Sequence, residues 1–266
     1  MEKDYLDYNR NAWNKRSELH INSDFYDVEG FLNGKSSLNS IELELLGDLK
    51  GKSVLHLQCH FGQDSISLAR LGAEVTGVDL SDKAIELANE LAEKDQSSAR
   101  FICSDIYELA EHLDEKFDIV FTSYGTIGWL PDLEKWAGLI RHFLKPNGKF
   151  VFVEFHPFVW MYDENFEKID YNYFKDEAII ETKEHSYTDG KLKEIITDVS
   201  WNHSLSEVFK SLIDNDLKIV SFHEYDYSPY DIFKGGEEFE KGKFRVRKWG
   251  NKLPLVYAIT ATKVAE

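Results

Sequence analysis

Two acidic residues each follow an apolar segment typical of a buried strand. Asp79 comes after 73–78, and Asp105 comes after 100–103. In an open α/β sheet, ligands bind beyond the carboxyl ends of the strands, and an acidic residue roughly 20 positions after a turn glycine accepts the hydroxyls of a ribose. Asp79 stands near that offset from Gly62, and Asp105 can accept from an exocyclic amine such as adenine N6. Together they predict an adenosine site, although either aspartate alone is better explained as a helix cap or turn residue.

The segments that would position these residues alternate between strand and helix patterns. Such alternation predicts an α/β, doubly wound, mostly parallel sheet. Ser81 is expected to cap a helix whose apolar residues recur at helical spacing. The expected strands are 53–57, 73–78, 100–103, 117–121 and 149–155. The expected helices are 63–71, one that follows Ser81 and has its apolar residues within 84–92, and one that Pro131 starts, with a turn at 146–148.

The pattern changes after residue 156. Residues 157–176 are rich in aromatic side chains and show no clear period, which indicates an insertion. Strands at 178–187 and 192–201 flank Thr188-Asp189-Gly190, a typical hairpin turn. A helix at 205–213, a strand at 217–222, a loop at 234–243 and a last strand at 255–262 follow. We expect a single domain, divided into an N-terminal arm (1–35), a core (36–156), an insertion and hairpin acting as a substrate lid (157–202), and a C-terminal part (203–266).

Five motifs occur in a fixed order along the chain: VLHLQCHFG, VTGVDLS, FICSDI, FDIVFTSYG and HFLKPNGKFVFVEF. Through them, roughly residues 40–155 and the final strands resemble the class I, Rossmann-like S-adenosylmethionine-dependent methyltransferases. The resemblance implies a seven-stranded sheet whose last strand is antiparallel. It also implies these cofactor contacts: Asp79 and Leu80 at the ribose, Asp105 and Ile106 at the adenine, Gln58, His60 and Gly62 beside the methionine part, Ser123 near the methyl group, and Trp13 and Arg16 from a covering helix.

The first turn departs from the D-x-G-x-G-x-G pattern of that family. His56 replaces the acid, Gln58 and His60 replace two glycines, and only Gly62 remains. A pyrophosphate needs glycines where the backbone approaches it, so these side chains argue against the nearest alternative, a nicotinamide-dependent oxidoreductase. The methionine part of S-adenosylmethionine has no phosphate and can be met by N–H groups and polar side chains.

Methyl transfer from a sulfonium requires mainly alignment and exclusion of water. Tyr124 and His156 are the candidate catalytic residues, although His156 is also explained as a structural histidine. The aromatic insertion and residues 124–129 are the candidate acceptor pocket, with simple lid packing as the alternative. Residues 122–125 read Thr-Ser-Tyr-Gly, not the Asn/Asp-Pro-Pro-aromatic motif of enzymes that methylate base amines. A non-catalytic S-adenosylmethionine-binding protein remains an alternative.

The composition favours a small-molecule acceptor over nucleic acid. The 266 residues carry a formal net charge of −17, which repels phosphate backbones. No apolar run is long enough to span a membrane, and the N-terminus lacks a secretory pattern, so we expect a cytoplasmic protein. The two cysteines, Cys59 and Cys103, are expected to be buried and reduced. No metal-binding spacing occurs. We expect a monomer or homodimer that engages neither nucleic acid nor membrane.

Overall fold

One central sheet has the strand order β3-β2-β1-β4-β5-β11-β8 in the computed structural model, which describes residues 4–188 and 191–264. Strand β11 runs antiparallel to both of its neighbours, β5 and β8, while β1 to β5 pair in parallel. The predicted sheet, with its antiparallel last strand, is therefore confirmed. The strands are β1 (Ser53–Leu57), β2 (Glu74–Asp79), β3 (Arg100–Cys103), β4 (Phe117–Ser123), β5 (Leu144–Phe155), β8 (Leu217–Tyr225) and β11 (Val256–Lys263).

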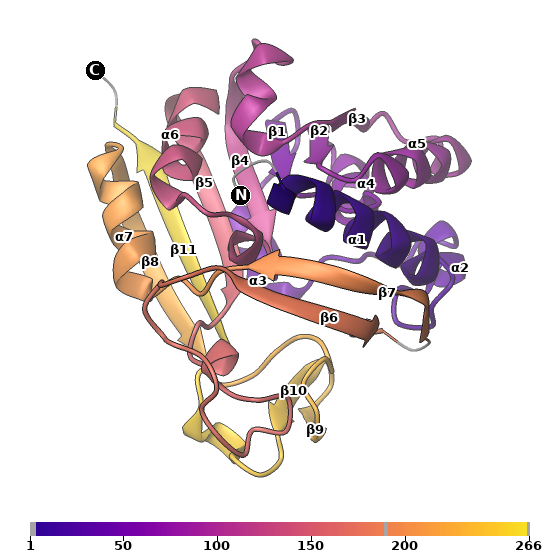
Figure 1. Ribbon diagram of the computed structural model, residues 1–266. Coiled ribbons are helices and arrows are strands. Elements are labelled where there is room, and N and C mark those ends of the chain that lie inside the picture. The colour runs from indigo at the N-terminus through magenta and orange to yellow at the C-terminus, as the bar shows by residue number, and fades with distance from the viewer. Residues whose placement is uncertain (1–3, 189–190, 265–266) are drawn as a thin grey trace.

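Helices cover both faces of this sheet (Figure 1). Helices α6 (Leu133–Phe143) and α7 (Leu205–Asp214) pack on one face through residues such as Trp136 and Leu212. Helices α3 (Ser40–Leu46), α4 (Gln63–Arg70) and α5 (Asp82–Asp95) pack on the other. Ser81 caps α5 as predicted, because its hydroxyl accepts from the Ala84 N–H at 2.9 Å. The remaining helices are α1 (Asp4–His20), α2 (Val28–Leu32), η1 (Ile106–Glu111), η2 (Ile127–Trp129), η3 (Val159–Met161) and η4 (Gly250–Lys252).

Three predictions about local structure were wrong. The expected loop at 234–243 holds a short hairpin of β9 (Gly236–Glu240) and β10 (Lys243–Val246), whose glycines and lysines hide the strand pattern. The expected turn at 146–148 is part of β5, which begins at Leu144 and absorbs extra residues through a register shift against β4. Cys103 is exposed because β3 is an edge strand, while Cys59 is buried as expected, and both are free thiols.

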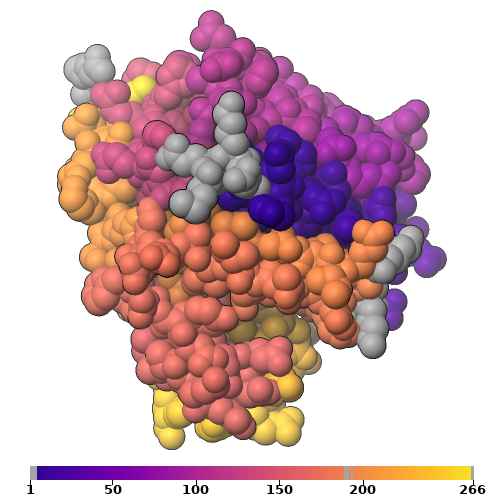
Figure 2. Space-filling view, in the orientation of Figure 1, coloured from indigo at the N-terminus to yellow at the C-terminus, as the bar shows by residue number. Residues whose placement is uncertain are grey.

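The insertion forms a hairpin that lies along helix α1 (Figure 1). Strands β6 (Ile179–His185) and β7 (Lys191–Ser200) pair antiparallel, and residues 189–190 of the predicted turn lie outside the described residues. Asn9 of α1 exchanges two hydrogen bonds with the Val199 backbone, at 2.8 and 2.9 Å. In the space-filling view, the hairpin and α1 form one continuous surface (Figure 2). The N-terminal arm and the hairpin therefore act as one cover.

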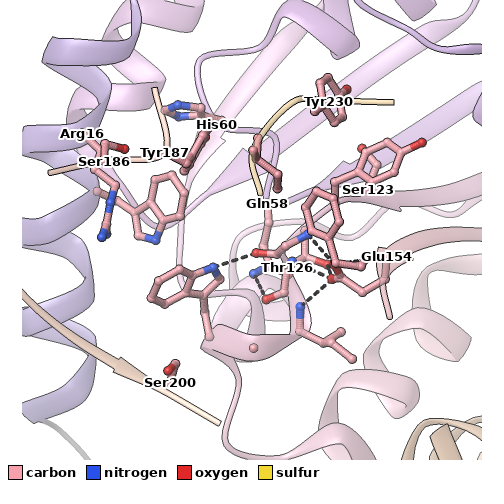
Figure 3. Close-up of a pocket in the computed structure, with 18 of the residues that line it drawn as sticks. Arg16, Gln58, His60, Ser123, Thr126, Glu154, Ser186, Tyr187, Ser200 and Tyr230 are labelled. Carbon is pink, nitrogen blue, oxygen red and sulfur yellow. Dashed lines mark hydrogen bonds between the residues drawn. The ribbon is translucent and has the colours of Figure 1, made fainter. Parts of the chain in front are cut away.

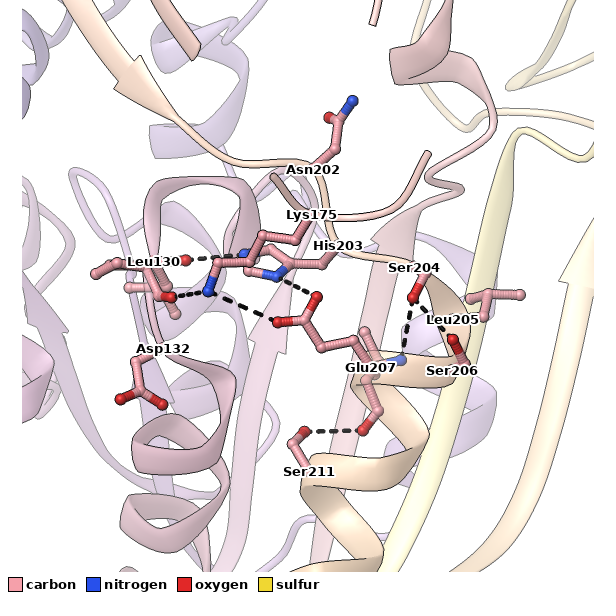
Figure 4. Close-up of polar contacts among 12 residues, drawn as sticks. Leu130, Asp132, Lys175, Asn202, His203, Ser204, Leu205, Ser206, Glu207 and Ser211 are labelled. Atoms are coloured by element: carbon pink, nitrogen blue, oxygen red, sulfur yellow. Dashed lines mark hydrogen bonds and ion pairs between the residues drawn. The ribbon is translucent and has the colours of Figure 1, made fainter. Parts of the chain in front are cut away.

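The chain returning from this hairpin is fixed by polar contacts at the start of α7 (Figure 4). The His203 ring hydrogen-bonds through Nε2 to the Leu130 carbonyl at 2.8 Å, and Glu207 forms an ion pair with Lys175 at 3.8 Å. The Trp201 N–H donates to the Gly128 carbonyl at 2.8 Å. These bonds join the insertion to the loop after β4. Within the described part of the chain, no helix is long and apolar enough to cross a membrane.

Candidate functional site

A cavity of about 1100 Å³ opens at the carboxyl ends of the parallel strands, between the sheet and the cover (Figure 3). It is slightly larger than the roughly 300–1,000 Å³ of most small-molecule sites. Three segments that are distant in the sequence converge on it: the turn at 58–62, the end of β2 and the end of β3. The residues predicted from the sequence that line it are Trp13, Arg16, Gln58, His60, Gly62, Asp79, Leu80, Asp105, Ile106, Ser123 and Tyr124.

The turn after β1 has three residues with a left-handed backbone conformation. Gln58, His60 and Gly62 have φ angles of 54°, 51° and 82°, all in the left-handed region. A Cβ on Gly62 would lie 2.7 Å from the Phe101 ring. Backbone conformation and packing therefore account for the single remaining glycine. His56, in place of the family's acid, is buried with Nδ1 bonded to the Ser65 hydroxyl at 2.8 Å, and burial lowers its pKa to about 3.

Asp79 connects this turn to the start of α5. Its Oδ2 accepts from the His60 N–H at 2.8 Å, and its Oδ1 accepts from the Ser81 N–H at 2.9 Å. Burial raises the pKa of this carboxyl to about 6, against the opposing effect of these N–H donors. Each carboxylate oxygen can still accept another hydrogen bond from the cavity. Asp105 similarly accepts from the Tyr107 N–H at 3.1 Å while lining the cavity. Both aspartates are thus turn or cap residues and also cavity walls.

Gln58 presents an acceptor that lacks a partner. Its Nε2 donates to the Thr126 carbonyl at 2.9 Å, which fixes the orientation of the amide. Its Oε1 is buried and has no hydrogen-bond partner. A buried unsatisfied acceptor is costly, and a ligand donor such as an ammonium would satisfy it. The methionine ammonium of S-adenosylmethionine therefore fits this position.

Glu154, which the sequence did not single out, holds the loop after β4. Its carboxylate accepts from the N–H groups of Thr126 (2.7 Å), Ile127 (3.2 Å) and Phe155 (2.7 Å), and also from that of Gly125. These bonds fix the loop that begins with Tyr124, whose φ is 43°. The position of Glu154 near the end of a predicted strand was the only sequence signal of this role. Three of its four backbone partners lie 27 or more residues away, so the bonds themselves could not be predicted.

Arg16 has a different partner from the predicted one. Its guanidinium forms a bidentate ion pair with Asp198 of β7, at 2.7 and 2.5 Å, and both side chains are buried. Its charge is therefore matched by the hairpin, not held free for a ligand carboxylate. The Trp13 ring lies edge-on to the His60 ring, with centroids 5.3 Å apart. Trp13 is thus placed over the 58–62 turn, and its contact with a cofactor remains a prediction.

A chain of neutral polar groups links the turn, the arm and the hairpin. His20 Nδ1 hydrogen-bonds to His60 Nε2 at 2.9 Å, and His20 Nε2 to the Ser186 hydroxyl at 2.6 Å. Burial, followed by the Arg16 charge, lowers the pKa of His20 to about 3, and burial also lowers that of His60. Both rings are therefore uncharged near neutral pH, and they join the two parts of the cover to the turn.

His156 does not line the cavity. Its Nε2 faces Glu224 Oε1 at 3.1 Å, and its Nδ1 accepts from the Phe158 N–H at 3.1 Å. Both ring nitrogens are therefore hydrogen-bonded to protein groups, directly after the carboxyl end of β5. This placement favours the structural alternative, and we do not propose His156 as a base.

A second carboxyl supports Tyr124 from behind the cavity wall. Glu42 of α3 is fully buried, accepts the Tyr124 hydroxyl at 2.8 Å, and accepts the Asn39 N–H at 2.7 Å. Burial, reinforced by the charge of Asp64, raises the pKa of Glu42 to about 7. Glu42 therefore fixes the phenol of Tyr124, which keeps its proton because burial raises the pKa of Tyr124.

Replacing Glu42 with glutamine is expected to remove a pH-dependent loss of stability. Because folding raises this pKa from 4.5 to about 7, the unfolded chain releases the proton first, and the folded state loses stability as pH rises from about 5 to about 8. Urea unfolding across that range should show Glu42→Gln gaining stability relative to the wild-type chain as pH rises. Glu44→Gln, an exposed change on the same helix, should show a constant difference, and a constant difference for Glu42→Gln would contradict the assignment.

Comparisons with known proteins find similarity to methyltransferases in sequence and in fold. Residues 54–148 match the family model described as a methyltransferase domain. A ubiquinone biosynthesis O-methyltransferase from Coxiella burnetii is 33% identical over 132 residues, which cover 48% of this chain and 56% of that protein. The chain therefore spans little more than half the length of that relative.

Two solved structures share the fold. A putative S-adenosylmethionine-dependent methyltransferase from Listeria monocytogenes superposes with a TM-score of 0.58 at 20% identity, covering 85% of this chain and 97% of that one. Geranyl diphosphate C-methyltransferase from Streptomyces coelicolor, solved with Mg²⁺, geranyl-S-thiolodiphosphate and S-adenosylhomocysteine, superposes with a TM-score of 0.56 at 15% identity, covering 85% and 77%. At these identities the likeness concerns the architecture.

Proposed function

We propose that this chain, whose residues 54–148 match a methyltransferase domain, is a class I, Rossmann-like S-adenosylmethionine-dependent methyltransferase that transfers a methyl group to a small-molecule acceptor. The observation that supports this most directly is the convergence of the 58–62 turn, Asp79 and Asp105 on one cavity. When bound, the cofactor supplies an electrophilic methyl group on a sulfonium. The residues of this chain bind it, orient the acceptor and exclude water.

Each part of the cofactor has a suitable group in the cavity. The free lone pairs of Asp79 receive the ribose hydroxyls, and Gln58 Oε1 receives the methionine ammonium. Asp105 accepts from the adenine amine, while Leu80 and Ile106 provide apolar contact on either side of it. The reacting end then lies toward Ser123, the last residue of β4, and Tyr124, which follows it.

The cover, formed by the N-terminal arm and the hairpin, excludes water from the site, as methyl transfer by alignment of the reactants requires. Arg16–Asp198 and His20–Ser186 join the arm to the hairpin over the cavity. Positioning of two reactants in this way can contribute several kcal/mol to catalysis without a strong base. Tyr124, supported by Glu42, is the residue that we place beside the acceptor.

Calorimetric titration of the full chain tests the cofactor assignment. We expect saturable binding of S-adenosylhomocysteine and S-adenosylmethionine and no binding of NAD at tenfold higher concentration, because side chains occupy the turn where a pyrophosphate needs glycine. Binding of NAD in preference to S-adenosylmethionine would instead support the oxidoreductase alternative. Cofactor binding without S-adenosylhomocysteine release from any amine, thiol, phenol or carboxylate acceptor would support a non-catalytic binding protein.

A further inference from the structure

The cavity wall carries many more carboxylates than cations. Ten acidic and three basic side chains line it among the described residues. All three basic side chains are already paired: Arg16 with Asp198, Lys35 with Asp27, and Lys183 with Glu181. A cavity with this balance repels anionic acceptors and attracts cations. The acidic side chains are Asp27, Asp64, Asp79, Asp105, Glu154, Asp163, Glu164, Asp170, Glu181 and Glu184.

Asp64 is a wall carboxylate that hydroxyl groups alone contact among the described residues. It lies in the first turn of α4, where its Oδ2 is 3.5 Å from the Ser123 hydroxyl, and the Ser37 hydroxyl is its other partner. Within the described ranges, no ion pair reaches it. By contrast, Glu154 and Asp79 receive backbone N–H groups on both of their oxygens. A poorly paired carboxylate away from bulk water is costly unless a ligand cation joins it.

Five aromatic rings in the wall surround the same part of the cavity. Tyr124 and Tyr230 pack edge to face with centroids 5.2 Å apart, and Phe25 lies 5.0 Å from Tyr26 and 5.7 Å from Tyr230. The Tyr26 and Tyr187 hydroxyls are 2.5 Å apart. Asp64 lies beside Tyr124, because its Oδ2 is 3.5 Å from the hydroxyl of the preceding residue, Ser123. Burial is the main cause of the raised pKa of Tyr26, Tyr124 and Tyr230, and the charge of Asp64 adds to it in each. We call Phe25, Tyr26, Tyr124, Tyr187 and Tyr230 the aromatic box.

From this juxtaposition, and resting on the proposed methyltransferase function, we propose that the acceptor is a small organic amine that enters as an ammonium ion and is held between Asp64 and the aromatic box. An ammonium nitrogen has no free lone pair, so it would first give one proton to the Asp64 carboxylate, which lies beside Ser123. The lone pair so freed would form the carbon–nitrogen bond as the methyl–sulfur bond breaks, leaving neutral S-adenosylhomocysteine and a positively charged methylated amine.

The faces of tyrosine and phenylalanine rings attract cations, and a carboxylate beside them adds a direct Coulomb attraction. The box includes Tyr124, at the end of β4 where we place the reacting methyl group. A phenolic or carboxylic acceptor would leave Asp64 without a counter-charge.

The test is a titration of the S-adenosylhomocysteine-saturated chain with choline and with 3,3-dimethylbutan-1-ol, its neutral isostere. Choline carries a quaternary nitrogen that cannot be methylated, so the titration measures binding alone. We expect choline to bind at least about tenfold more tightly than the neutral alcohol. Asp64→Asn should reduce choline affinity at least about tenfold while changing S-adenosylhomocysteine affinity less than about threefold. Glu86→Gln removes one exposed charge from α5, outside the cavity wall, and should leave both affinities unchanged.

Two further variants separate cation binding from a structural role. Tyr230→Leu should weaken choline binding, and Tyr230→Phe, which keeps the ring face, should retain it. Ligand-free Asp64→Asn should melt at a higher temperature than the wild-type chain, because it removes a poorly compensated charge.

Equal binding of choline and its isostere, or an unchanged choline affinity in Asp64→Asn, overturns the proposal. A large loss of S-adenosylhomocysteine affinity in Asp64→Asn assigns Asp64 to the cofactor and also overturns it. Failure of the unmodified chain to bind S-adenosylhomocysteine at all would instead reject the underlying methyltransferase function.

Discussion

Replacing Arg16 with methionine should lower the free energy of unfolding by about 3–5 kcal/mol, the usual cost of removing one partner from a buried ion pair. Both side chains of the Arg16–Asp198 pair are almost fully buried, at 5% and 2% exposed. Among the described residues, the variant leaves the Asp198 carboxylate with only Lys183, at 3.7 Å and half-exposed, as a counter-charge. Because this pair joins α1 to β7, we expect the hairpin to detach first. Urea unfolding measures the free energy, and amide hydrogen exchange measures the detachment.

Arg10 provides a matched control on the same helix. It pairs with Asp7 at 3.3 Å in an exposed position, so Arg10→Met should cost no more than about 1 kcal/mol. Combining Arg16→Met with Asp198→Leu removes both buried charges and should recover most of the lost stability, because apolar replacements of a buried pair are often neutral. If Arg16→Met costs no more than Arg10→Met, the pair does not fasten the cover.

The alternating core could be predicted from the sequence because its central strands, such as β1 and β4, are buried on both faces. Such strands read as continuous apolar runs, and the helices between them bury one periodic stripe. Local chemistry also fixed individual boundaries, as at Ser81, whose hydroxyl caps α5. The family motifs then identified which strand ends to inspect, and the structure brings those ends to one cavity.

The pairing of Arg16 could not be predicted, because its partner lies 182 residues away in the insertion. The aromatic box could not be predicted for the same reason, since Tyr124 and Tyr230 are far apart in the sequence and come into contact only in the folded chain. The sequence did not single out Asp64, because its contact with Ser123, 59 residues away, forms only in the folded chain. Local sequence patterns thus predicted the strands and helices of the core. The pairing of charged side chains in the site depends on long-range contacts and could not be predicted.

Replacing Asp79 with alanine should weaken S-adenosylhomocysteine binding about a hundredfold, or about 2.7 kcal/mol. Hydrogen bonds to charged groups contribute roughly 1.5–3 kcal/mol each, and two ribose hydroxyls would lose their acceptor. The same carboxylate also holds the His60 and Ser81 N–H groups, so its removal loosens the turn that faces the methionine part. The protein should remain folded, since burial raises the pKa of Asp79 and its loss removes a desolvated charge. Calorimetry gives the affinity and thermal melting gives the stability.

Glu86→Gln supplies the charge-matched comparison for this measurement. Glu86 pairs with Lys83 on the exposed side of α5 and does not line the cavity, so its loss changes the net charge equally without touching the ligand. Its S-adenosylhomocysteine affinity should match that of the unmodified chain. An Asp79→Ala variant that is folded and binds as tightly as Glu86→Gln would remove Asp79 from the binding site.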